Sequence, residues 1–111
     1  MKNVIYIILI LLFVLTACQK ENSVQPFNYE RDTPAWLKVK IDSMATAPDY
    51  IGTVVYRYEL HKQFIYHIMF PISSCAYCEL YLHDGSKVQL SENLLSDFLQ
   101  NRTNEIIIWA R

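Results

Sequence analysis

Glycine and proline are scarce in this sequence of 111 residues, which holds two glycines and four prolines. This scarcity argues against a disordered or low-complexity chain, because such chains are rich in both residues. An excess of positive charge is also missing. The formal net charge is −1, and we therefore expect no nucleic acid among the partners. The length allows one domain and excludes most enzymes with a separate cofactor domain.

An apolar run near the N-terminus has the length of a signal peptide rather than that of a membrane span. Lys2 precedes 12 consecutive apolar residues, from Val4 to Leu15. A helix that crosses a bilayer needs about 20 such residues. The core of a secretory signal peptide needs only about 7–15. We therefore interpret residues 1–17 as a signal peptide.

The run ends in Leu15-Thr16-Ala17-Cys18, which resembles the lipobox of bacterial lipoproteins. That motif consists of an aliphatic residue, two small residues and a cysteine. The resemblance implies that Cys18 receives a diacylglycerol and becomes the first residue of the mature chain. Two or three acyl chains would hold the protein in a membrane, since each buried CH₂ contributes about 0.8 kcal/mol. An ordinary signal peptide with a chance cysteine and an uncleaved anchor helix are the alternatives.

The residues after this cysteine bear on which membrane holds the protein. Gln19 stands where an aspartate favours inner-membrane retention in the enterobacterial sorting rule, so the resemblance implies the outer membrane. Gln19-Lys20-Glu21 also resembles the export signal of Bacteroidota surface lipoproteins. We expect a lipid-anchored protein of the bacterial outer membrane, on its periplasmic or its cell-surface face.

The mature chain divides into a tether and a folded domain. Residues 18–32 comprise the acylated cysteine and a stretch without apolar periodicity, which we interpret as a flexible tether. Residues 33–111 predict a small α+β domain. Thr33 is suited to cap a first helix, Pro34 to begin it and Pro48 to end it. The apolar residues of this helix recur near helical spacing: Trp36, Leu37, Ile41 and Met44.

Two alternating runs, 52–60 and 64–70, predict a pair of antiparallel strands. A three-residue loop of His61, Lys62 and Gln63 would place Tyr58 opposite Tyr66 and make one face wholly apolar. Further strands are predicted at 78–83 and 87–90, joined by a turn at Asp84-Gly85, and at 105–110 as an inner strand. Ser91 is suited to cap a second helix, whose apolar stripe is Leu94, Leu95, Phe98 and Leu99.

This order of elements predicts a short antiparallel sheet of four to five strands. Both helices are expected to pack on its one apolar face. The order also resembles a family of small Bacteroidota lipoproteins whose domain has no assigned function. The motifs that carry the resemblance are Pro34-Ala35-Trp36-Leu37, the paired tyrosine-rich strands, the cysteine cluster and Leu80-Tyr81-Leu82-His83-Asp84-Gly85. It covers about Thr33 to Trp109 and implies no active-site residues.

Cys75-Ala76-Tyr77-Cys78 is the one motif whose side chains suggest a chemical role. A structural disulfide is favoured, because small exported domains commonly use disulfides. A redox-active pair is the second interpretation, although such pairs usually stand at a helix N-terminus, and here a strand is predicted to follow. Half of a metal site with His67 and His83 is the third, but zinc needs four ligands, or three and a water.

Recognisable catalytic motifs are missing. The sequence holds no G-x-S-x-G motif, no phosphate-binding glycine-rich loop and no paired carboxylates, so we expect neither an enzyme nor a cofactor. The tyrosines and tryptophans could form a platform for a glycan or an envelope protein, or simply pack in the core. The sequence therefore predicts a lipoprotein with a binding or envelope-support role. The alternative is a tethered thiol–disulfide protein that uses Cys75 and Cys78.

Overall fold

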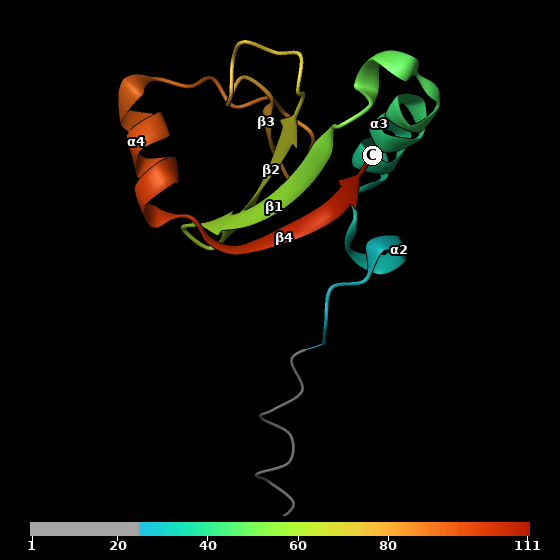
Figure 1. Ribbon diagram of the computed structural model, residues 1–111. Coiled ribbons are helices and arrows are strands. Elements are labelled where there is room, and N and C mark those ends of the chain that lie inside the picture. The colour runs from blue at the N-terminus through green and yellow to red at the C-terminus, as the bar shows by residue number, and fades with distance from the viewer. Residues whose placement is uncertain (1–24) are drawn as a thin grey trace, which may run out of the picture.

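The computed structural model describes residues 25–111, so the predicted signal peptide, the lipobox and Cys18 lie outside the described residues. Four strands form one antiparallel sheet in the order β3-β2-β1-β4 (Figure 1). The α+β class and the antiparallel sheet are confirmed. The strands are β1 (Val54–Leu60), β2 (Gln63–Met69), β3 (Leu80–Leu82) and β4 (Thr103–Ala110).

The two main helices cover opposite faces of this sheet, not one face as the sequence predicted (Figure 1). Val55 of β1 packs with the first of them, whereas Tyr58 packs with the second. Residues three positions apart in a strand point to opposite faces, which separates the two helices. None of the helices within residues 25–111 is long and apolar enough to cross a membrane. The helices are α2 (Tyr29–Asp32), α3 (Ala35–Thr46), the 3₁₀ helix η1 (Pro48–Tyr50) and α4 (Glu92–Asn101).

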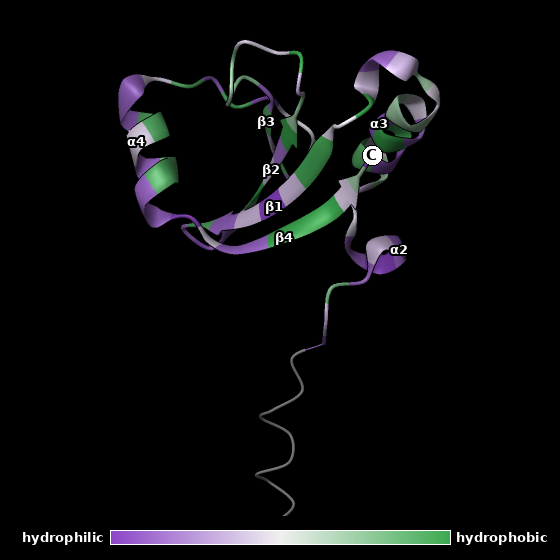
Figure 2. Ribbon diagram, viewed as in Figure 1, coloured by the Kyte–Doolittle hydropathy of each residue, from purple (hydrophilic) through white to green (hydrophobic). Residues whose placement is uncertain are grey.

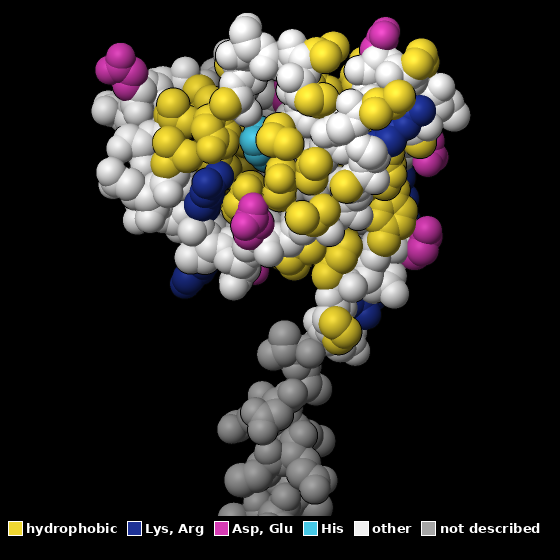
Figure 3. Space-filling view, viewed as in Figure 1, with side chains coloured by type: hydrophobic (Ala, Val, Ile, Leu, Met, Phe, Trp, Pro, Cys, Tyr) yellow, Lys and Arg dark blue, Asp and Glu magenta, His cyan; other side chains and the backbone are white. Residues whose placement is uncertain are grey.

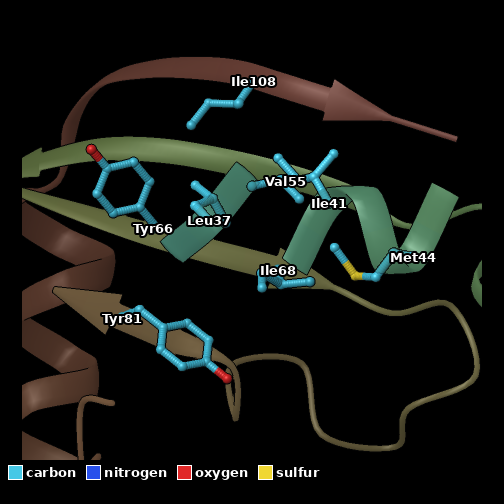
Figure 4. Packing of buried hydrophobic residues seen from close by; sticks show 8 residues of the cluster. All are labelled: Leu37, Ile41, Met44, Val55, Tyr66, Ile68, Tyr81 and Ile108. Carbon is cyan, nitrogen blue, oxygen red and sulfur yellow. The ribbon is translucent and has the colours of Figure 1, made fainter. Parts of the chain in front are cut away.

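The face under α3 carries the larger apolar cluster (Figure 4). Three residues of α3 at helical spacing are buried, as the sequence predicted: Leu37, Ile41 and Met44. Arg111 donates hydrogen bonds to the carbonyl oxygens of Met44 and Ala47, which satisfies the C-terminal end of this helix. The cluster is completed by Val55, Tyr66, Ile68, Tyr81 and Ile108 from the four strands.

The face under α4 carries a smaller, aromatic cluster. Phe98 is the one buried residue of α4, and its ring meets Tyr58 edge-on with centroids 5.4 Å apart. The Arg102 guanidinium lies over the same two rings. The predicted cap is confirmed, because the Ser91 hydroxyl accepts a hydrogen bond from the Leu94 amide at 3.3 Å. Figure 2 shows apolar residues of α4 on the side of the helix that faces the sheet.

The pairing of β1 with β2 differs from the prediction by one residue. His61 and Lys62 form a two-residue turn with φ of 49° and 64°, and Tyr58 lies opposite Ile65 rather than Tyr66. Such a turn needs positive φ at both positions, which non-glycine residues adopt at a cost. The prediction assumed that only one face is buried. Since helices cover both faces, that criterion did not select the register.

Two predicted strands are placed differently. The segment 87–90 forms no strand and makes one isolated bridge, from Tyr81 to Lys87. The last strand is not an inner strand, because β4 pairs only with β1 and lies at the sheet edge. Ile107 on this edge strand is 59% exposed, and Figure 3 shows apolar side chains continuing over this side of the molecule between α4 and α3.

The N-terminal end of the domain begins earlier than predicted. Asn28 caps α2, and Phe27 and Tyr29 pack against the α3 cluster. Residues 25–32 are therefore joined to the fold, while the remainder of the predicted tether lies outside the described residues. The sequence predicted Thr33 as the cap of α3, and the structure does not confirm this. Pro34 is the N-cap residue of that helix, and it provides no side-chain hydrogen bond.

Candidate functional site

A cleft of about 480 Å³ opens where the α2–α3 connection meets strands β1 and β2. Its volume lies in the range of small-molecule sites, which is about 300–1,000 Å³. We call it the Arg57 cleft. It is lined by Gln25, Arg31, Asp32, Thr33, Pro34, Arg57, Phe64 and His83.

Arg57 projects from the middle of β1 on the same face as α3. Its guanidinium carbon lies 4.8 Å from the centroid of the Phe27 ring and 4.2 Å from that of Phe64. Both contacts are cation–π contacts, which hold a guanidinium without neutralising it. Within residues 25–111, Arg57 forms no ion pair with a carboxylate.

The other arginine of the cleft is neutralised by its neighbour. Arg31 donates to both carboxylate oxygens of Asp32, at 2.8 and 2.9 Å. Hydrogen bonds from Arg31 and from the Asn28 amide hold the pKa of Asp32 well below its usual range. The lining residues therefore carry two arginines and one aspartate, which leaves one formal positive charge.

His83 is fixed in the cleft wall from two sides. The Trp36 indole Nε1–H donates to the His83 carbonyl oxygen at 2.9 Å, which ties the turn after β3 to the start of α3. The Tyr66 hydroxyl lies 2.8 Å from His83 Nδ1. Burial raises the pKa of Tyr66, so its hydroxyl stays protonated and is able to donate to Nδ1. In the tautomer whose Nδ1 accepts from Tyr66, Nε2 carries the ring proton and is a hydrogen-bond donor.

Thr33, one of the residues that line the cleft, has a buried and unsatisfied hydroxyl. Thr33 is 6% exposed, and its Oγ1 has no hydrogen-bond partner within the described part of the chain. Pro34 follows as the uncapped start of α3. The first N–H groups of a helix and its macrodipole both favour an anion at this end. Positive potential from the helix therefore adds to that of Arg57.

A second hollow of about 420 Å³ shares Phe64 and His83 with the Arg57 cleft. Its remaining lining residues are Lys62, Gln63, Leu82 and Asp84, whose formal charges cancel. The two spaces thus adjoin across Phe64 and His83. The residues that line the Arg57 cleft carry a net positive charge, and those that line the second hollow are neutral in sum.

The structure joins Cys75 and Cys78 in a disulfide in the loop between β2 and β3, with both cysteines exposed. His67 Nε2 donates to the Ala76 carbonyl oxygen at 2.7 Å and fixes the centre of this loop. The Tyr77 ring packs on His67 with centroids 5.0 Å apart. Burial lowers the pKa of His67, so its ring is neutral at pH 7. A strand, not a helix, follows the pair, as predicted.

The structure does not bring His67 and His83 together. His67 contacts the disulfide loop on the α4 side, whereas His83 faces the α3 side through Tyr66. Within residues 25–111 no three His, Cys, Asp or Glu side chains are grouped to hold a metal ion. The third histidine, His61, lies in a turn as predicted and also pairs with Asp97 of α4 at 2.8 Å.

The sequence analysis missed the residues that form the Arg57 cleft. The sequence does not single out Arg57, and it offers His83 only as a possible metal ligand. The available signal was an arginine in the middle of a strand rich in valine and tyrosine, since a half-buried arginine needs a partner or a function. Comparisons with protein-family models, with curated proteins and with solved structures find no match for this chain.

Proposed function

We propose that this chain is a lipid-anchored protein of the bacterial outer membrane whose α+β domain binds a ligand and catalyses no reaction. The anchor rests on the lipobox Leu15-Thr16-Ala17-Cys18, and the assignment to small Bacteroidota lipoproteins rests on the motifs that resemble that family. The observation that carries the binding role is the Arg57 cleft, which has in its wall a fixed histidine and a guanidinium that forms no ion pair within residues 25–111. The partner would be an envelope component, in line with the predicted location.

The anchor is tested by substituting the acylated residue. Cys18→Ser should abolish fatty-acid labelling and release the protein from the membrane fraction, because acyl chains supply the membrane affinity. Cys75→Ser is the matched control, since it removes a cysteine of the same chain that lies outside the lipobox. If the Cys18 variant is labelled and fractionates as the parent does, the lipoprotein assignment is wrong.

The binding role is tested in cells of the native bacterium. A photoreactive amino acid replaces Phe64 in the cleft or, as a control, Val39, which is 70% exposed on α3. Intact-mass analysis after irradiation should show an adduct for position 64 that position 39 lacks. Equal adduct patterns at the two positions would contradict a ligand-binding role for the cleft.

A second candidate is a tethered thiol–disulfide protein, which the exposure of Cys75 and Cys78 favours. Its support is weaker, because the pair is not at a helix N-terminus, where the macrodipole would lower a thiol pKa. Measurement of the reduction potential distinguishes the two functions. A structural disulfide has a potential below about −300 mV, whereas a catalytic pair lies well above that value.

A further inference from the structure

The Arg57 cleft has a charge balance that selects among anions. Arg31 and Asp32 neutralise each other at 2.8 Å, so that Arg57 supplies the one uncompensated charge of the lining residues. A ligand with a single negative charge would balance it. A phosphate monoester, with nearly two charges at pH 7, would leave an excess beside the Asp32 carboxylate.

The donors of the cleft suit a carboxylate. A guanidinium presents parallel N–H groups that match the two oxygens of a carboxylate. His83 adds a donor at Nε2 when the Tyr66 hydroxyl, 2.8 Å away, donates to its Nδ1. Thr33 and Pro34, at the start of α3, which has no side-chain cap, also line this space.

The adjoining hollow indicates what the carboxylate is attached to. Phe64 separates the two spaces and is half-buried, so its ring offers apolar surface to a ligand that spans them. Beyond it, Leu82 adds apolar surface, while Lys62 and Asp84 cancel in charge. An uncharged body with an apolar group fits this hollow better than a second charged group does.

We propose that the Arg57 cleft binds the carboxylate of a small monoanionic ligand, with the uncharged, partly apolar body of the ligand lying across Phe64 in the adjoining hollow. Arg57 pairs with the carboxylate, and His83 Nε2 donates to it. This inference rests on the proposed binding role and adds the chemical class of the ligand.

The test compares two probes that differ only in charge. N-acetyl-4-fluorophenylalanine carries a carboxylate, and its carboxamide is neutral and of the same shape. The full chain is purified in non-ionic detergent, and fluorine NMR follows each probe during titration, with empty micelles as the blank. The acid should bind at least about tenfold more tightly than the carboxamide, since the guanidinium–carboxylate pair is lost in the amide.

Variants show whether Arg57 causes this preference. Arg57→Gln should reduce the ratio of the two affinities to near one. Arg57→Lys, which keeps the charge and the aromatic contacts, should retain a smaller preference. Arg102→Gln is the matched control, because Arg102 also lies over aromatic rings but on the α4 face, and it should leave the ratio unchanged.

Several results would overturn the ligand class. They are equal affinity of the acid and the carboxamide for the parent chain, an acid preference that survives in Arg57→Gln, and the absence of binding by both probes. None of them decides the binding role itself. The binding role is tested separately, by the adduct that is expected at position 64 in cells. A carboxylate ligand can therefore be refuted while the cleft remains a binding site.

Discussion

The contact between Trp36 and Gly85 supports a quantitative prediction, because it joins the start of α3 to the turn that presents His83. Gly85 has φ of 91°, and a Cβ atom built there would lie 3.1 Å from Trp36 Cγ and 3.2 Å from Cδ1. Gly85→Ala therefore has two costs. The positive φ costs about 1–2 kcal/mol, and crowding against the indole costs about 1 kcal/mol more.

Removing the indole should relieve only the second cost. Trp36→Ala alone should lower the free energy of unfolding by about 3 kcal/mol, since the half-buried ring packs on Tyr66 and Tyr81. In the Trp36→Ala background, Gly85→Ala should then cost about 1 kcal/mol less than it does in the parent domain. Urea unfolding of residues 25–111, followed by far-UV circular dichroism, provides the four values of this double-mutant cycle.

Gly52 is a matched control for this cycle. It has φ of 88°, and its added Cβ would lie 3.1 Å from Pro71 Cγ and would not meet the Trp36 indole. Gly52→Ala and Trp36→Ala should therefore add within about 0.5 kcal/mol. If Gly85→Ala and Trp36→Ala are equally additive, the indole does not position the turn, and our account of how His83 is held is wrong.

Three further predictions concern the disulfide, the buried histidine and the domain boundary. Replacing both Cys75 and Cys78 with alanine should lower the free energy of unfolding by up to about 2 kcal/mol in urea titrations, and no loss would exclude a structural role. Burial lowers the pKa of His67 from 6.5, so the unfolded chain takes up the proton first. Stability should therefore fall as pH drops below about 6.5, by at most about 1.4 kcal/mol per pH unit, and a His67→Gln variant that shows the same fall would refute this origin. A chain that begins at residue 33 should be about 2 kcal/mol less stable than one that begins at residue 26, since it lacks the packing of Phe27 and Tyr29. Equal urea midpoints of the two chains would show that residues 26–32 do not contribute to the fold.

Local patterns predicted the elements of this domain better than their arrangement. The spacing of Leu37, Ile41 and Met44 located α3, and the Ser91 hydroxyl located the start of α4. The Asp84-Gly85 turn is also present, with Gly85 at positive φ. Each of these signals lies within a few residues of its effect, which is why the sequence alone contains it.

The arrangement of the helices and strands depends on contacts between residues that are far apart in the sequence. Nothing within residues 91–101 tells which face of the sheet Phe98 covers, and that choice decides whether one face or both are buried. The register of β1 and β2 followed from the wrong choice. The Arg57 cleft was missed for the same reason, because Phe27, Arg57 and His83 come together only in the folded chain.

The placement of α3 and α4 on opposite faces of one sheet has a consequence for local opening. Helix α3 has three buried residues, whereas Phe98 is the one buried residue of α4. Its other links are the His61–Asp97 pair, which is largely exposed, and the contacts of Arg102. Helix α4 can therefore detach while the α3 cluster stays intact, which would uncover Tyr58 and Leu80. In native-state hydrogen exchange, the amides of α4 would then exchange as one unit, at a lower free energy than those of α3.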